Sequence, residues 1–251
     1  MRLFPVLVVA LVAANTHAAS APDLADTCGA SSSYDLTITP NVLRFDRAAP
    51  APRGIDLRNG RLVVDGMAAA PNTEERDRLV LFEQELRMLV PKARTVARNG
   101  VDLAVQAVRA ETGGLGLAAD TRADLDRRLA AHAADLKRRI DASNSTHDWQ
   151  GDAFDRYADD IATDIAPLIA ADLGQQAVSA AMSGDLDAAA TLRDRAASLG
   201  GDLQPRLERR MQALRPQIQA LCPSIRRLQE LQQGVRDANG RALDLLDVTT
   251  S

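Results

Sequence analysis

The sequence is poor in the residues that most often carry out chemistry. Its 251 residues include three histidines and two cysteines. A histidine-rich zinc site is therefore excluded, and so are sites built on Cys-x-x-Cys pairs or an HExxH helix. The GxSxG, SxxK and P-loop patterns are also absent. The segment TGGLG at 112–116 has no strand before it and predicts a break between helices. We expect no cofactor.

Lysine is almost missing as well. Of the 30 basic residues only Lys92 and Lys137 are lysines. Without its first 18 residues the chain has 29 basic and 34 acidic residues, a net charge of −5. A nucleic-acid-binding protein would need a clustered basic face, so we expect no nucleic-acid partner.

Only one long apolar run is present, from Leu3 to Ala14, and small residues follow it. A single basic residue, this run and the small residues form the layout of a secretory signal peptide, and the run is too short to span a bilayer stably. We predict a signal peptide over residues 1–18, with cleavage after Ala18; cleavage after Ser20 also fits. An uncleaved membrane anchor is the alternative.

The rest of the chain is expected to be periplasmic, and it is not predicted to be an integral membrane protein. No later segment approaches the ~18 apolar residues of a transmembrane helix. A lipoprotein is disfavoured, because residues 24–27 before Cys28 lack the small residues of a lipobox.

Cys28 and Cys222 are the two cysteines, one near each end of the mature chain. An even number of cysteines in an oxidising compartment favours a disulfide. Two unrelated thiols are the alternative. If the two are paired, the bond ties the front of the chain to its last long helix.

The segment between residues 34 and 66 predicts short β-strands. Residues 34–39 alternate apolar and polar side chains up to Pro40, and 42–45 is a second candidate strand. Residues 55–57 and 62–64 flank Asn59-Gly60, the strongest signal for a two-residue hairpin. We expect Asp56, Arg58 and Arg61 to face solvent, and residues 19–33 to be irregular.

Everything after Pro71 reads as amphipathic helix. Asn72 and Glu75 form a capping box at the start of the first helix. Proline and glycine set the expected boundaries: the first helix ends before Pro91, a break falls at Gly200-Gly201, and a last helix runs from Ser224 to the end. Between them we expect helices over residues 91–111, 120–141, 152–183 and 185–199.

These elements predict an α+β protein, mostly α. We expect a small N-terminal antiparallel β-hairpin sheet packed on a bundle of long amphipathic helices. The expected divisions are the signal peptide at 1–18, a β segment at 19–70 and a helical bundle at 71–251. The last two are expected to form one folded unit linked by the disulfide, with the hairpin as a lid on an apolar groove.

In their order along the chain, several segments resemble the YggN family of bacterial periplasmic proteins, a domain of unknown function. The matching segments are Cys28, LTITP at 36–40, GRLVVDG at 60–66, FEQELRMLVPKA at 82–93 and Cys222 with its helical tail. The chain departs from the family by inserting a Pro/Ala connector at 48–53. The resemblance implies export and a shared fold, and it brings no activity, substrate or catalytic residue.

A row of aspartates is the pattern that comes closest to a metal site. Asp148, Asp152, Asp155 and Asp159 recur near i, i+4, i+7 and i+11. Carboxylates on one helix face could hold Ca²⁺ or Mn²⁺. A solvated face that offsets the helix dipole is the favoured interpretation, because no metal-binding loop accompanies the row.

Three of the few aromatic residues lie beside this row and form the candidate ligand-binding group: Trp149, Phe154 and Tyr157. Clustered rings could receive a cationic or apolar ligand. Core packing is favoured for Phe154 and Tyr157, which share a helix face with Ile161. His132, on the apolar stripe of its own helix, is expected to be a partly buried structural residue.

Three functions remain open at this point. A non-catalytic binding or interaction protein of the cell envelope is favoured, because amphipathic helices are plentiful and catalytic patterns are missing. The partner would be an unknown envelope protein. The alternatives are a carrier of an apolar ligand held between the helices and a metal-assisted enzyme that uses the aspartate row.

Overall fold

The structure is a computed structural model that describes residues 24–149 and 152–249; for residues 152–159 and 197–208 it describes the backbone alone. The predicted signal peptide lies outside the described residues. The described chain forms two compact units, and each is presented by itself. The sheet unit comprises residues 24–100, 136–149, 152–157 and 214–249. The helical unit comprises residues 101–135 and 158–213.

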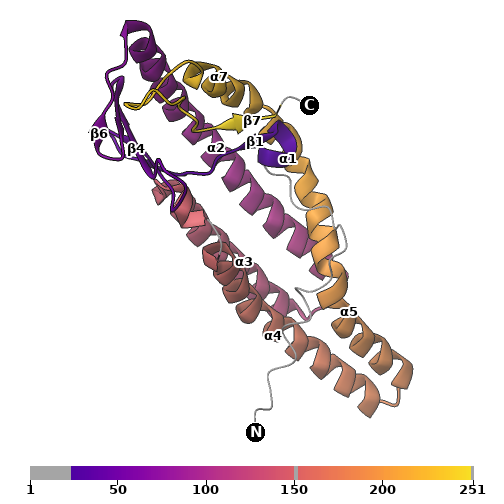
Figure 1. The fold of residues 1–251 in the computed structure, drawn as a ribbon. Helices are drawn as coiled ribbons and strands as arrows, with labels where there is room; N and C mark the ends of the chain where they lie inside the picture. The colour runs from indigo at the N-terminus through magenta and orange to yellow at the C-terminus, as the bar shows by residue number, and fades with distance from the viewer. Residues whose placement is uncertain (1–23, 150–151, 250–251) are drawn as a thin grey trace. The chain divides into compact units, whose positions relative to one another are not determined.

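The sheet unit contains a five-stranded antiparallel sheet in which each strand pairs with the next. Its order is β2-β3-β4-β5-β6. The strands are β2 (Asp35–Ile38), β3 (Leu43–Asp46), β4 (Gly54–Arg58), β5 (Arg61–Val64) and β6 (Met67–Ala68). The expected strands are confirmed, with β6 as an addition. The indigo-to-violet strands precede the long magenta helix α2 (Figure 1).

The predicted hairpin is present between β4 and β5. Arg58 pairs with Arg61, which leaves Asn59 and Gly60 as the turn, with φ angles of 49° and 73°. Positive φ at both positions is what a two-residue hairpin turn requires. A Cβ on Gly60 would lie 2.6 Å from Cγ of Arg76, so the turn rests directly on a helix. That helix is α2 (Thr73–Gly113), whose predicted capping box is confirmed by reciprocal bonds between Asn72 and Glu75.

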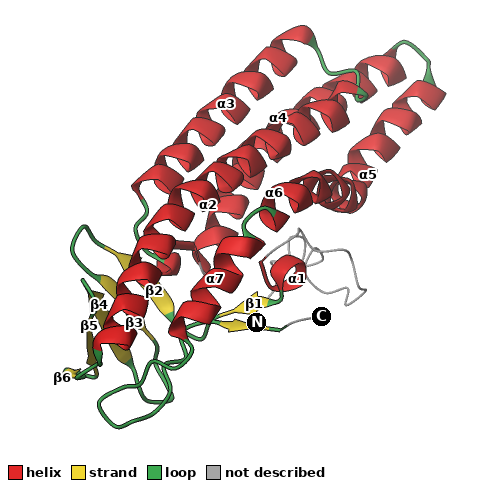
Figure 2. Cartoon of the chain, turned by 90° about the horizontal axis from the view of Figure 1, so that it is seen from above, coloured by secondary structure: helices red, strands yellow, loops and turns green. Residues whose placement is uncertain are grey.

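One face of the sheet makes the core of this unit. Inward side chains alternate along the strands because successive residues of a strand point to opposite faces. Leu43, Leu57 and Val64 are at most 1% exposed. They pack with Leu79 and Phe82 of α2 and with residues of α7 (Cys222–Gln232), as the arrangement of yellow strands beside these helices shows (Figure 2). The hairpin residues Ile55, Leu57, Leu62 and Val64 belong to this core, and the groove beneath the hairpin stays a prediction.

Helix α2 continues through Pro91, and the expected end at Val90 is wrong. Proline removes one backbone donor, so the bond to the carbonyl of Arg87 is missing. The turns on either side are fixed by other contacts: Leu86 and Leu89 before the proline are buried in the core of the sheet unit, and Ala93 and Val96 after it pack against that core. Packing therefore outweighs the loss of one hydrogen bond.

The C-terminal segment also departs from expectation. Helix α7 ends at Gln232, and Gly234 has a φ of 84°. The buried Gln232 side chain accepts hydrogen bonds from the backbone of Leu245 and Leu246, 3.0 Å each, and donates one to the carbonyl of Leu246. The amide side chain thus binds the returning segment at residues 245–246 to the end of α7.

The two ends of the described chain meet in the sheet unit. A short helix α1 (Leu24–Cys28) and strand β1 (Ala30–Ser31) occupy the segment that was expected to be irregular. Strand β1 pairs antiparallel with β7 (Asp247–Val248). Cys28 and Cys222 form a disulfide with a Cα–Cα distance of 5.3 Å, as predicted. The remaining short elements of this part are η3 (Gln212–Leu214) and α6 (Arg215–Gln219).

The helical unit is built from parts of α2, α3 (Ala119–Ala142) and α4 (Asp152–Met182), together with α5 (Leu186–Met211). Its core residues are Leu117, Leu125, Leu129, Ile165, Ile169 and Leu173. The expected break at Gly200-Gly201 is wrong, because α5 runs through both glycines. Each costs about 1 kcal/mol in a helix interior, which the burial of neighbouring residues such as Leu192 can offset.

Together these elements confirm the expected class, α+β and mostly α. Among the helices that the structure describes, none combines the length and the apolar character needed to cross a bilayer.

Candidate functional site

The outer face of the sheet carries charged side chains in two rows that run across the strands. The register places Asp35 opposite Asp46, and Asp46 opposite Gly54. In the next row Arg44 lies opposite Asp56. Like charges directly opposite each other destabilise an antiparallel pair. The first row therefore places two carboxylates together beside a residue without a side chain.

A cavity of about 490 Å³ opens over this face, and we call it the sheet cleft. Aspartates and arginines make up most of its lining: Asp35, Asp46, Asp56, Asp65, Arg44, Arg47 and Arg53. Its size is within the range of ordinary ligand sites. Unlike most such sites, its wall is dominated by charge.

Arg44 is shared between two carboxylates of the cleft. Its Nε donates to both oxygens of Asp46, at 2.9 and 3.1 Å. Its Nη1 lies 3.7 Å from Oδ1 of Asp56, which is within ion-pair range and too long for a hydrogen bond. That Oδ1 is covered from solvent and has no hydrogen-bond partner among the described residues. The bond to Asp46 raises the pKa of Arg44.

The wall formed by residues 47–53 is held in place by Arg47. Its Nε donates to the carbonyls of Pro50 and Pro52, 2.9 Å each, and its Nη1 donates to Oγ of Ser33 at 2.6 Å. The guanidinium also lies 4.1 Å from the ring centroid of Tyr34, a cation–π contact. Burial raises the pKa of Tyr34. Arg47 therefore serves mainly to shape the cleft.

Asp65 closes the floor of the cleft. Its Oδ1 accepts hydrogen bonds from the backbone amides of Arg53 and Gly54, at 2.7 and 2.9 Å. The bond from Gly54 is the main cause that lowers the pKa of Asp65. At the opposite side, Oδ1 of Asp35 accepts a bond from the hydroxyl of Thr146 at 3.4 Å.

Gly54 keeps the centre of the cleft open. A Cβ at this position would lie 3.8 Å from Oδ1 of Asp46 and 4.0 Å from Nη2 of Arg44, which are ordinary contact distances. Alanine would fit there without strain, and a larger side chain would project toward the charged groups. The absence of a side chain thus leaves space beside Asp46, on the side away from Asp35.

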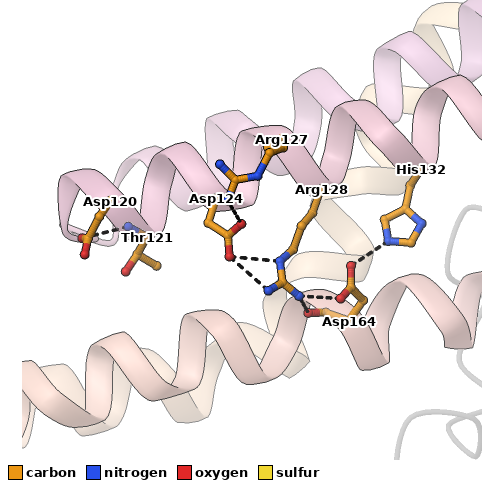
Figure 3. A network of polar contacts seen from close by, with 7 residues as sticks. All are labelled: Asp120, Thr121, Asp124, Arg127, Arg128, His132 and Asp164. Carbon is orange, nitrogen blue, oxygen red and sulfur yellow. Dashed lines mark hydrogen bonds and ion pairs between the residues drawn. The ribbon is translucent and has the colours of Figure 1, made fainter.

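A second polar cluster lies in the helical unit and joins α3 to α4 (Figure 3). Arg128 bonds Asp124 on its own helix at 3.1 Å and Asp164 on α4, and His132 Nε2 lies 2.9 Å from Asp164 Oδ2. The bond to His132, and then Arg128, lower the pKa of Asp164. The bond to Arg128 is likewise the main cause that lowers the pKa of Asp124. Each side chain drawn in Figure 3 has a partner, so we interpret the cluster as a structural link between α3 and α4.

Of the residues predicted as a ligand or metal site, the structure describes the side chains of two. Trp149 Nε1 donates to Oγ of Ser143 at 2.8 Å, and that hydroxyl donates to Oδ2 of Asp148 at 2.8 Å. Both lie in η2 (Thr146–Trp149) and serve to fix a turn. The side chains of the other predicted residues lie outside the described part: Asp152, Asp155, Asp159, Phe154 and Tyr157. Both site predictions stay predictions.

A search of the described residues for metal sites finds no cluster of three or more potential ligands. His132 lies partly buried on α3, as expected, with 26% of its side chain exposed. The sequence did not indicate its partner, Asp164.

Sequence reasoning missed the sheet cleft. It assigned Asp56 to solvent, whereas this residue is half-buried in the cleft; Arg58 and Arg61 are exposed, as expected. A signal was available, because the Asn59-Gly60 turn fixes the register of β4 and β5. To predict how β3 pairs with β4, the effect of the 48–53 connector on the register would also have had to be known.

The fold and the cleft define a class: a mostly helical α+β protein with a disulfide-linked sheet unit and a charged cleft on the outer face of its sheet. The chain belongs to a family described as a protein of unknown function, DUF2884, whose profile matches residues 28–244. No curated protein and no solved structure shows significant similarity to it.

Proposed function

We propose that this protein is exported to the periplasm and acts there as a non-catalytic binding protein whose binding site is the sheet cleft. Within its family we place it with the YggN-like proteins, on the segments that carry that resemblance. Export is supported by the composition of residues 1–18 and by the Cys28–Cys222 disulfide, which suits an oxidising compartment.

The composition of the cleft carries the binding part of the proposal. Its lining, which lies wholly within the described residues, consists of Asp, Arg, Ala, Gly and Val. It offers no serine, cysteine, histidine or lysine to act as a nucleophile or as a base tuned to neutral pH. The carboxylates and guanidiniums can hold a polar ligand by charge-assisted hydrogen bonds.

Site-specific photocrosslinking in intact cells tests the cleft. A photoreactive amino acid at Ala48, an exposed residue of the lining, is compared with one at Arg58 on the exposed hairpin. We expect a discrete adduct at position 48 that weakens when Gly54→Val fills the cleft. The same adduct pattern at both positions, or no change with Gly54→Val, would contradict the proposal.

Export is tested separately by cell fractionation with intact-mass measurement. We expect a periplasmic protein that lacks residues 1–18 and is two hydrogens lighter than the dithiol form. A full-length cytoplasmic protein with two free thiols would overturn this part and leave the cleft experiment unaffected.

A further inference from the structure

We propose that the sheet cleft binds an organic cation, a guanidinium or a primary ammonium group, at Asp35 and Asp46, with the space that Gly54 leaves on the other side of Asp46 receiving the rest of the ligand. This inference rests on the proposed function, since it names the ligand class of the same site.

The first argument is the charge of the cleft. Its lining has four aspartates and three arginines. One of the arginines, Arg47, is bonded to backbone carbonyls and a hydroxyl, so it neutralises no carboxylate directly. Asp35 and Asp46 face each other across β2 and β3 with the same charge. Arg44 already bonds Asp46, and Nδ1 of the exposed His147 lies 3.5 Å from Oδ2 of Asp35. A further cation between the two carboxylates would lower the repulsion that remains.

The second argument is the position of Arg44. In the free cleft its Nε bonds Asp46, and its Nη1 lies 3.7 Å from Oδ1 of Asp56, which is beyond hydrogen-bond distance. Oδ1 of Asp56 is covered and lacks a donor. A ligand cation that takes over Asp46 would leave Arg44 free to complete its bond to Asp56. In this scheme the ligand replaces Arg44 at Asp46 and Arg44 moves to Asp56. Each of the two carboxylates then has a cationic partner.

The third argument concerns the kind of cation. A cavity of about 490 Å³ is far larger than a bare metal ion requires. Among the described residues no group of three or more potential metal ligands is found. Oδ1 of Asp65 already accepts two backbone amides, so this oxygen could join a metal shell only at the expense of those bonds. A planar guanidinium, by contrast, can bond two carboxylates at once.

The same chemistry has two sources, a free small amine and the side chain of a basic residue in another protein. We therefore choose two probes, agmatine and an acetylated, amidated Gly-Arg-Gly peptide. Each is titrated at low salt into the full mature protein, and amide chemical shifts are recorded. Binding of agmatine alone would indicate a small-molecule site, and equal or tighter binding of the peptide would indicate a basic segment of a partner; either result supports the inference.

The expected result is a saturable shift of the amides around Asp35, Asp46 and Gly54. Asp46→Asn should weaken binding about ten-fold or more, because a charge-assisted bond is replaced by a neutral one. Gly54→Val, which leaves every charge in place, should weaken it as well. Asp77→Asn is the matched control, since it removes the same charge from an exposed position of α2 in the sheet unit.

Two results would overturn the inference. One is the absence of shifts with both probes, and the other is an equal loss of affinity in Asp46→Asn and Asp77→Asn. N-acetylaspartate is titrated in parallel. If this anion shifts the cleft and the cations do not, the ligand class is wrong and the cleft remains a binding site. If no probe binds and the Ala48 crosslink is also missing, the proposed function fails too.

Discussion

At the scale of single residues, the buried Glu83 explains why a hairpin can rest on a helix. It is 7% exposed, and its Oε2 accepts the backbone N–H of Asn59 at 2.7 Å. Its Oε1 accepts from Nη2 of Arg87 at 3.0 Å, and Arg87 donates onward to the carbonyl of Thr39 at 2.7 Å. One carboxylate thus joins the hairpin turn, the helix and the end of β2.

We expect Glu83→Ala to destabilise the protein by about 2–4 kcal/mol, because it leaves the N–H of Asn59 and the half-buried guanidinium of Arg87 without this acceptor. Urea unfolding followed by circular dichroism measures the change. Gln84→Ala, at the neighbouring exposed position, is the control and should stay within about 0.5 kcal/mol of the parent. Equal effects of the two substitutions would show that Glu83 does not support the turn.

Gly60 and Gly66 form a matched pair that separates backbone strain from packing. Their φ angles are 73° and 79°, so alanine is strained at both, by about 1 kcal/mol or somewhat more. A Cβ on Gly60 would lie 2.6 Å from Arg76 and 2.9 Å from Val80, whereas one on Gly66 meets nothing within 4 Å. We expect Gly60→Ala to cost about 1–3 kcal/mol more than Gly66→Ala in free energy of unfolding.

The thermal midpoints of these two variants give the comparison directly. If they prove equal, the hairpin turn does not pack against α2 as closely as its geometry requires.

At the scale of elements, local signals were reliable where they act within a few residues. The Asn59-Gly60 turn and the Asn72–Glu75 capping box both formed, because each satisfies backbone groups next to it in sequence. Proline and glycine were poor guides inside long helices. Pro91 and the pair Gly200-Gly201 lie within helices, because tertiary packing outweighs a local cost of a few kcal/mol.

Helix α7 shows the opposite error. The apolar spacing continues beyond Gln232, yet the chain leaves the helix there. Val235, Leu243 and Leu245 are buried all the same, so the non-helical backbone also brings apolar side chains of this segment into the core. Spacing alone could not reveal that the Gln232 side chain would bind the returning segment.

The link between α3 and α4 predicts a dependence on pH. The bonds from His132 and Arg128 depress the pKa of Asp164 in the folded state. The contribution of this carboxylate to stability is therefore full above its unfolded pKa, near 4, and is lost as the pH falls through the lower folded value. We expect Asp164→Asn to destabilise the protein at pH 7 and to differ less from the parent as the pH drops below about 4.

Unfolding curves recorded between neutral and acidic pH measure this difference. Asp160→Asn, an exposed position one turn away and outside the network of Figure 3, is the control. If the difference in stability between Asp164→Asn and the parent stays constant as the pH falls into the acidic range, the ionised form of Asp164 does not stabilise the protein.

At the scale of the whole molecule, the disulfide is the strongest single constraint. It joins residues 194 positions apart. In the chain-entropy model, closing so long a loop stabilises the folded state by about 5 kcal/mol. The double variant Cys28→Ser, Cys222→Ser should lose much of this free energy, as measured by urea unfolding. Dithiothreitol should lower the stability of the parent and leave the double variant unchanged; an effect of the reductant on both would point to another cause.

The candidate site was less predictable than the fold, for a physical reason. The cleft depends on residues from three strands that the register brings together, and on Gly54, which contributes by having no side chain. Asp35, Asp46 and Asp56 lie far enough apart in sequence that no short motif contains them. A pairing between strands must be known before such a row can be recognised.

The pairing of β1 with β7 has a consequence for how the chain matures. Strand β1 leaves the ribosome long before its partner exists, because Ala30 pairs with Val248, which follows 218 residues later (248 − 30). The N-terminal segment therefore cannot complete its structure until the C-terminal segment has been synthesised. Pairing of β1 with β7 is therefore a late step in the folding of this chain.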